Sequence, residues 1–168
     1  IAFEKLGILN SKSINIINKQ KPKVMNFIRD QLNKRKLEAK IFNHNWTIRS
    51  DTYFSKQVKI NLSKLSLLGK HQKFNAGLAI HLAKNILKNS FDITTTEKAL
   101  EKCQWPGRLQ LIDKGSIPKK IIKYKNIYLD GFHNIDGMKV LIESLNSNRK
   151  ILICSFLNNK KYRYMLSN

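Results

Sequence analysis

Residues 126–134 read NIYLDGFHN, and the pattern around this stretch decides the predicted fold. Asn126 to Leu129 predict a short strand. The apolar positions that follow are Met138, Leu141, Ile142 and Leu145. Their spacing predicts a helix with one buried face, and the run from Ile151 to Phe156 predicts a second strand. A strand, a helix and a strand at this spacing predict a parallel βαβ unit, and therefore an α/β fold.

The first half of the chain predicts further strands and a helix. Ile14 to Ile17 reads as a buried strand. Pro22, followed by apolar residues at helical spacing, predicts a helix that ends near Ala39. Two more strands are expected, one at Ile41 to Ile48 and one through the alternating residues Val58, Ile60 and Leu62.

Two helices and a break are expected before the βαβ unit. Residues 67–87, LLGKHQKFNAGLAIHLAKNIL, predict a buried helix after a glycine turn. Thr94 lies three residues before Glu97, which predicts a capping box at the start of a short helix. In WPGRLQ, residues 105–110, the Pro disfavours helical backbone before it and the Gly turns freely. This stretch is therefore expected to end the helix and to separate two domains.

The composition limits the classes of protein that fit the chain. Lys plus Arg number 32 against 11 for Asp plus Glu, a formal charge of +21. This charge makes nucleic acid or an anionic membrane the first partner to consider. The cations are mostly Lys, however, and are spread through every segment without the interleaved Arg and aromatic residues of a base-stacking surface. A basic nucleic-acid-binding protein is therefore the weaker alternative, and neither nucleic acid nor membrane is expected as a partner.

The cysteines and the apolar runs indicate the compartment. Cys103 and Cys154 form no CxxC pair and have no His at ligand spacing, which argues against a zinc site or a disulfide framework. No apolar run approaches the roughly 20 residues that span a bilayer, and no signal peptide opens the chain. A cytoplasmic location is expected. Because the sequence begins at Ile1 and stops at YMLSN, we expect an interior fragment of a longer protein.

Several polar residues stand where a ligand site is expected. Asp130, His133 and Asn134 follow a predicted strand, and open α/β sheets bind ligands at such strand ends. Asp130 and Asn134 equally suit a capping role, and a single loop His is commonly structural. Arg108 offers a planar fork for phosphate, or else forms a surface ion pair. Asn75 suits an N-cap, or an amide that pairs with a planar heterocycle.

Four stretches occur in a particular order along the chain: IAFEKLGIL, GKHQKFNAGLAI, WPGRLQ and LDGFHN. In sequence and in order they resemble the folylpolyglutamate synthase and dihydrofolate synthase family of the Mur ligase superfamily, across nearly all 168 residues. The resemblance implies that residues 1–106 are the second part of a Mur-ligase-type central ATP-binding domain. Residues 107–168 would then be the first part of a Rossmann-like C-terminal domain.

The resemblance also implies a reaction. Family members join a pteroate or folate carboxylate to the amino group of L-glutamate. ATP first phosphorylates the carboxylate, and the amine then displaces phosphate from the acyl phosphate. Magnesium ions and cationic side chains neutralise the charge that collects between the two anions. ATP and Mg²⁺ are the implied cofactors, L-glutamate and a pterin or folate are the implied substrates, and a monomer is the usual state.

Five residues match positions of the family's active site. Lys5 matches the lysine that is carbamylated and so becomes an anionic magnesium ligand; without the resemblance it would be a solvated lysine. Asn75 matches the residue that meets adenine, and Arg108 the one that meets the ATP phosphates. Asp130 matches an ATP contact, which we assign to the ribose hydroxyls. His133 matches the loop histidine near the acyl-phosphate and glutamate end.

The chain also departs from the family pattern. Leu6 and Phe132 stand where the family has Ala, and the Phe132 ring could crowd the nucleotide loop. Ile135 and Asp136 stand where a Pro is usual, and Lys161 replaces an acidic residue. The Gly-rich phosphate loop of the form GTNGKGS and the upstream Glu and His magnesium ligands are absent, so the isolated chain is expected to be inactive.

Two choices stay open. A cell-wall Mur ligase is the nearest alternative enzyme, although HQKFNA, WPGR and DGFHN are closer to the folate branch. Within that branch, the substrate is dihydropteroate, reduced folate or both.

Overall fold

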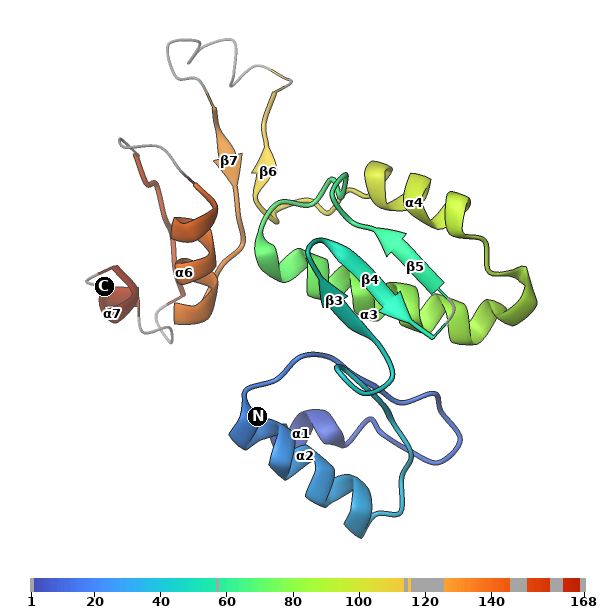
Figure 1. Ribbon diagram of the computed structural model, residues 1–168. Helices are drawn as coiled ribbons and strands as arrows, with labels where there is room; N and C mark the ends of the chain where they lie inside the picture. Colours follow the sequence, from blue (N-terminus) through green and yellow to red (C-terminus); the bar gives the residue numbers. More distant parts are fainter. Residues whose placement is uncertain are drawn as a thin grey trace. The chain divides into compact units, whose positions relative to one another are not determined.

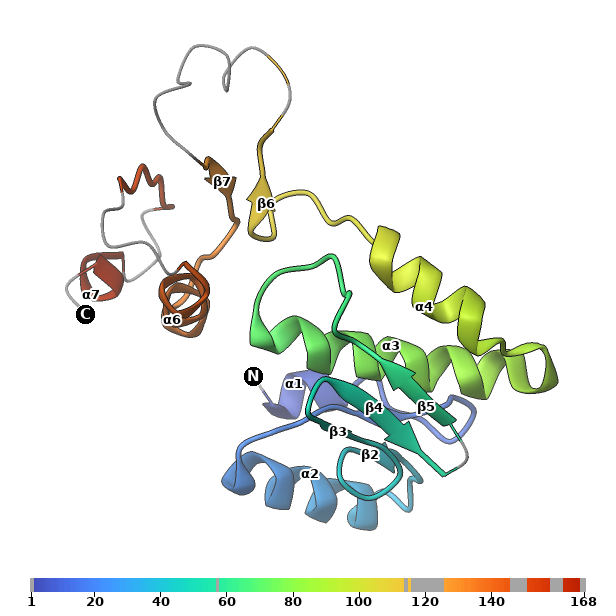
Figure 2. The ribbon, with the colours of Figure 1, turned by 45° about the horizontal axis from the view of Figure 1, so that its top comes forward.

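The computed structural model describes residues 2–56, 58–113, 115, 126–145, 151–157 and 162–166, the side chains of Tyr164 and Met165 excepted. The chain divides into two compact units, each of which is described by itself (Figures 1 and 2). Unit 1 contains Ile1–Lys64 and Lys73–Glu101, and unit 2 contains Leu65–Gln72 and Lys102–Asn168. Among the described residues, no helix is both long enough and apolar enough to cross a membrane.

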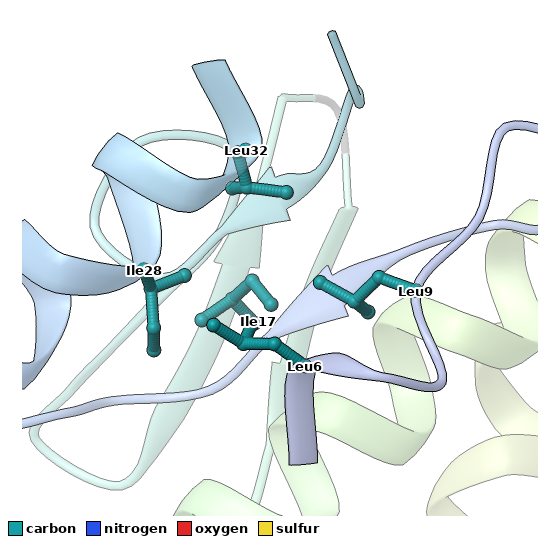
Figure 3. Close-up of a cluster of buried hydrophobic side chains, with 5 residues drawn as sticks. All are labelled: Leu6, Leu9, Ile17, Ile28 and Leu32. Atoms are coloured by element: carbon teal, nitrogen blue, oxygen red, sulfur yellow. The ribbon is translucent and has the colours of Figure 1, made fainter. Parts of the chain in front are cut away.

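Unit 1 begins with a parallel strand–helix–strand arrangement. The elements are α1 (Ala2–Leu6), β1 (Ile16–Ile17), α2 (Pro22–Lys34) and β2 (Lys40–Ile41). β1 and β2 pair in parallel, and α2 connects them. Buried side chains from α1, the loop after it, β1 and α2 point toward one another and form one core (Figure 3): Leu6, Leu9, Ile17, Ile28 and Leu32.

Arg35 fixes the loop after α1 to the end of α2. Its guanidinium donates to the carbonyl oxygens of Leu6 and Leu9, at 2.7 and 2.6 Å. α2 stops at Lys34 because Lys36 takes a left-handed φ of 53° and the Leu37 amide bonds back to the carbonyl of Leu32. The expected continuation of this helix to near Ala39 is therefore wrong.

The second part of unit 1 is an antiparallel sheet covered by a helix. β3 (Thr47–Arg49), β4 (Thr52–Ser55) and β5 (Val58–Asn61) pair in that order. α3 (Lys70–Leu87) lies along one face of this sheet (Figures 1 and 2). The fully buried side chains of this layer are Tyr53, Ile60, Leu62 and Ile80. A short turn, η1 (Lys88–Ser90), and α4 (Ile93–Lys102) follow.

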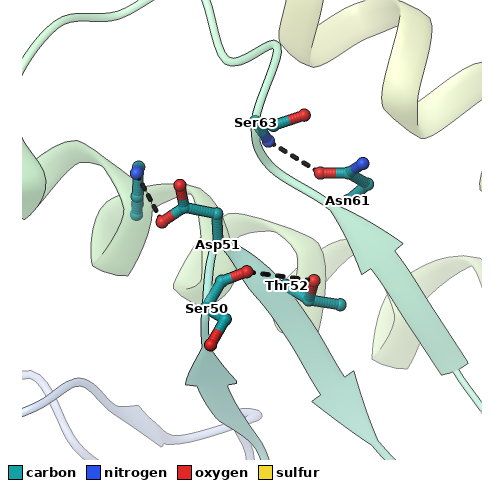
Figure 4. Close-up of polar contacts among 6 residues, drawn as sticks. Ser50, Asp51, Thr52, Asn61 and Ser63 are labelled. Atoms are coloured by element: carbon teal, nitrogen blue, oxygen red, sulfur yellow. Dashed lines mark hydrogen bonds and ion pairs between the residues drawn. The ribbon is translucent and has the colours of Figure 1, made fainter.

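Two turns with left-handed backbone divide this region into more strands than were expected. Asn43 takes a left-handed φ of 65°, so the predicted run from Ile41 to Ile48 breaks into β2 and β3. Ser50 and Asp51, with φ of 42° and 60°, then turn the chain into β4, which the sequence did not predict. The carboxylate of Asp51, which Figure 4 labels, pairs with the ammonium of Lys73 on α3, and this ion pair fixes the turn against the helix.

The described residues of unit 2 include an antiparallel strand pair and the helices that follow it. β6 (Gln110–Leu111) pairs with β7 (Tyr128–Leu129), and α6 (Ile135–Ser144) and α7 (Tyr162–Leu166) follow. The predicted parallel βαβ unit is wrong here, because residues 151–157 carry no strand. Their apolar side chains are largely exposed, Ile153 to 93%. An apolar run becomes a strand only where a neighbouring strand satisfies its backbone groups, and no described residue does so here.

The start of α4 also differs from the expected capping box. Asp92, not Thr94, is the capping residue, since its carboxylate accepts from the amide of Thr95 at 2.6 Å. The hydroxyl of Thr96 also donates to the carbonyl oxygen of Asp92. Asp92 therefore supplies acceptors for two donors in the first turn of the helix. Hydrogen bonds to Thr95, through its side chain first and its backbone next, lower the pKa of Asp92.

Candidate functional site

Unit 2 places the Arg108 loop beside the Asp130 loop. Arg108 precedes β6 and Asp130 follows β7, and the antiparallel register sets Gln110 opposite Leu129. The two loops are joined where the Gly131 amide donates to the Gly107 carbonyl at 2.8 Å. Two of the residues predicted to form a site thus come from adjacent ends of paired strands.

The Asp130 carboxylate holds the backbone that follows Arg108. Its Oδ2 accepts from the amide of Leu109 at 2.7 Å. Leu109 is 3% exposed and has a left-handed φ of 48°, a conformation that costs a non-glycine residue about 1–2 kcal/mol. Gly107, at φ 71°, turns the chain just before it. Asp130 therefore stabilises the turn that presents the exposed Arg108 side chain.

His71 interacts electrostatically with Asp130 and with Arg108. It lies in the first turn of α3 within unit 2, and its Nδ1 is buried with no hydrogen-bond partner among the described residues. Burial lowers the pKa of His71; the Asp130 carboxylate opposes this shift and the Arg108 guanidinium adds to it. His71 stands in the HQKFNA motif, but nothing in the sequence analysis assigned it to the site. No spacing along the chain marked it, because its partners come from other segments.

The loop after Asp130 leads into α6. Asn134 caps this helix, since its Oδ1 accepts from the Gly137 amide at 2.8 Å, so the capping interpretation is confirmed for Asn134. His133 is exposed, and its Nδ1 lies 3.1 Å from the Gly131 carbonyl oxygen. The Phe132 ring packs edge-on against the Phe156 ring, with 5.5 Å between the ring centroids.

The other two predicted residues belong to unit 1. Lys5 is exposed on α1, and Asn75 is exposed on α3. α3 begins at Lys70, directly after Gly69 with φ of 102°, so Asn75 lies within the helix and the predicted N-cap role is wrong.

In the described ranges, no three His, Cys, Asp or Glu side chains form a metal-binding group. Mg²⁺ binds proteins through only one or two carboxylates, with phosphate and water completing its shell, and a carbamate on Lys5 fits one such ligand.

Comparisons with known proteins test the resemblance. No protein-family profile matches the chain. It is 32% identical over 110 residues to a dihydrofolate synthase/folylpolyglutamate synthase of Bacillus subtilis (strain 168), covering 61% of this chain and 24% of that protein. It is 31% identical over 153 residues to a folylpolyglutamate synthase of Saccharomyces cerevisiae (strain FostersO), covering 82% of this chain and 24% of that protein. The folylpolyglutamate and dihydrofolate synthase resemblance is confirmed.

Solved structures of this family have the same fold. A solved FPGS-AMPPCP-folate complex superposes with a TM-score of 0.69 at 21% identity, covering 85% of this chain and 36% of that one. This likeness confirms the predicted α/β fold class. The chain spans about a quarter of the length of the curated relatives that it matches.

Proposed function

We propose that the chain is part of an ATP-dependent ligase that joins L-glutamate to dihydropteroate, folate or both through an acyl phosphate. Its curated relatives are named for these two activities, and a solved structure of similar fold holds AMPPCP, an ATP analogue, and folate. The observation that carries the proposal is the joining of the Arg108 and Asp130 loops in unit 2. That arrangement places a guanidinium and a carboxylate at adjacent strand ends.

The two parts of the chain take different roles in this proposal. Residues 1–106 form the second part of the central ATP-binding domain, and residues 107–168 form the first part of the C-terminal Rossmann-like domain. The division of the chain into units at Glu101 and Lys102 supports a boundary in this region. The enzyme acts as a monomer in the cytoplasm and binds neither nucleic acid nor membrane.

Each side chain has a defined part in nucleotide binding. Arg108 donates two parallel hydrogen bonds to phosphate oxygens, which its planar fork suits better than a lysine ammonium would. Asp130 has one carboxylate oxygen committed to the Leu109 amide, and the other accepts from a ribose hydroxyl. Asn75 presents an amide donor and acceptor to the adenine edge. His71 stays uncharged near Asp130 and Arg108, because burial lowers the pKa of its imidazole.

The chemistry requires two anions to meet. The substrate carboxylate attacks the γ-phosphorus, the bond to the ADP oxygen breaks, and the amine of glutamate then displaces phosphate and loses a proton. Mg²⁺, when bound, screens the phosphate charge, with Lys5 as a carbamate for one ligand. Arg108 neutralises charge on the transferring group, and His133 lies at the acyl-phosphate and glutamate end. Charge neutralisation of this kind supplies most of the rate in phosphoryl transfer.

The test is Arg108→Lys in the complete enzyme, with Arg29→Lys on the exposed side of α2 as the matched control. Turnover is expected to fall by about 100-fold in Arg108→Lys, the loss typical of removing one charge-stabilising donor. The thermal midpoint should stay within about 2 °C of the parent, because Arg108 is exposed and mutations away from buried features rarely change stability.

The assay is glutamate-dependent release of ADP, with dihydropteroate and tetrahydrofolate as alternative substrates. Full turnover in Arg108→Lys would remove Arg108 from the phosphate site. ADP release that needed a nucleotide-linked muramyl substrate instead would assign the enzyme to cell-wall synthesis. Binding of RNA that weakens steeply with salt, with no ADP release on any substrate, would favour the basic nucleic-acid-binding alternative.

A further inference from the structure

Unit 1 carries a groove of about 700 Å³ that the proposed nucleotide site does not use. Phe42, which lines it, directly follows the carboxyl end of β2, and Lys19 follows the end of the parallel strand β1 after Asn18. Residues of β3 and β4 form the other wall. The carboxyl ends of parallel strands are where open α/β sheets bind ligands. Lys5, Asn75, Arg108, Asp130 and His133 do not line this groove.

Aromatic rings form the apolar part of the groove. Phe54 and Phe74 are half-buried, so part of each ring is accessible. Trp46 is 2% exposed, and its Nε1 has no hydrogen-bond partner among the described residues. The Cε3–Cζ3 edge of the indole lies against Gly77 of α3, so its N–H edge faces away from the helix. Trp46 lines the groove, so the signal of its indole N–H can report a change in the groove's surroundings.

Three cationic side chains line the groove, and no carboxylate does. They are Lys19, Arg49 and Lys56. None of these three forms an ion pair within the described ranges. The Lys19 ammonium lies 4.6 Å from the centroid of the Phe74 ring, so one side chain already brings a positive charge to an aromatic surface.

We propose that this groove binds a planar aromatic ligand that carries an anionic group, either a phosphate or a carboxylate. The ring packs against Phe54 and Phe74, and the anion is held by Lys19. Sites of this kind combine aromatic walls with a few convergent polar groups, as this groove does. The ligand is distinct from the ATP whose phosphates meet Arg108, and the inference does not depend on the ligase activity.

The experiment follows the indole N–H signal of Trp46 by NMR in the 168-residue chain. The chain has two Trp residues, so Trp105→Phe, at a side chain 64% exposed, leaves Trp46 as the single reporter. The probes are AMP, benzoate, adenosine and inorganic phosphate. AMP, benzoate or both should shift the Trp46 signal at concentrations where adenosine and phosphate do not. A response to AMP alone would show that the groove takes an aromatic phosphate, and a response to benzoate alone would show that it takes an aromatic carboxylate.

Three variants in the Trp105→Phe background locate the binding. Lys19→Ala should raise the Kd by about tenfold, as expected for loss of one hydrogen bond to a charged group. Lys23→Ala, an exposed cation on α2 with the same charge change, should alter it by less than about twofold. Arg108→Ala should leave it unchanged. The proposal would be overturned if neither AMP nor benzoate shifted the Trp46 signal, or if Lys19→Ala and Lys23→Ala changed the Kd equally. A loss of the response in Arg108→Ala would also overturn it, because the response would then come from the Arg108 site.

Discussion

His81 makes the stability of unit 1 sensitive to acid. The side chain is 5% exposed, its ring stacks on Trp46 at 5.9 Å, and its Nδ1 lies 2.7 Å from the Tyr53 hydroxyl. Its Nε2 is buried with no partner among the described residues. Burial, with smaller contributions from Lys84 and Lys40, lowers the pKa of His81 from 6.5 to about 4. Protonation would place an uncompensated charge between the sheet and α3.

The sign and the size of the effect follow from this shift. The unfolded imidazole takes up a proton near pH 6.5 and the folded one only near pH 4, so the unfolded state binds more protons between these values. The free energy of unfolding therefore falls as the pH drops through this window and is at its full value above it. One pKa unit corresponds to about 1.4 kcal/mol, so the loss amounts to about 3 kcal/mol.

The assay is urea unfolding of unit 1 between pH 7.5 and 4, followed by Trp46 fluorescence in the Trp105→Phe background. His81→Asn is the comparison, because its amide can replace the bond to Tyr53 but does not titrate. The parent should lose about 3 kcal/mol more than His81→Asn across the window. Parallel pH profiles for the two proteins would refute the reasoning, since the acid sensitivity would then come from other groups.

Three further substitutions test particular contacts. Gly77→Ala should cost about 1–3 kcal/mol of unfolding free energy, because the new Cβ would lie 2.6 Å from Cζ3 of buried Trp46; an unchanged urea midpoint would contradict this packing. Gly107→Ala meets no atom within 4 Å but keeps a φ of 71°, so a cost of about 1 kcal/mol from backbone strain alone is expected, and a stabilised variant would show that the turn relaxes. Asp92→Ala should speed hydrogen exchange at the Thr95 amide while Asp92→Asn should not, since Asn keeps the cap; equal rates in both would deny the cap its role.

The sequence predicted the helices whose formation depends mainly on residues close together along the chain. The apolar spacing predicted a helix at 67–87, and α3 is present at 70–87. Pro106 and Gly107 predicted the end of the next helix, and α4 ends at Lys102, shortly before them. β4 was missed because Ser50 and Asp51 are not the Asn-Gly or Asp-Gly pair that marks a tight hairpin turn. The 151–156 strand failed because strand formation depends on a neighbour, which a local run does not reveal.

The candidate site divides in the same way. Asn134 was recognised as a possible cap from its place before a helical pattern, and the structure confirms that role. Asn75 was misplaced because α3 begins at Lys70, one turn earlier than its polar side chain suggested. His71 was missed because its closeness to Arg108 and Asp130 arises from three separate segments of unit 2, and no spacing along the chain encodes it.

Asp130 shows that the structural and functional interpretations of one residue are coupled. Its Oδ2 holds the Leu109 amide, and Leu109 follows Arg108 directly, so loss of the carboxylate would free the turn that presents the guanidinium. Asp130→Asn can keep an oxygen for the Leu109 amide but removes the charge that offsets Arg108 beside His71. Asp130→Ala removes both. A carboxylate that only supported the turn would make Asn nearly equivalent to Asp, whereas one that also binds a ribose would separate the two in nucleotide affinity with the turn intact.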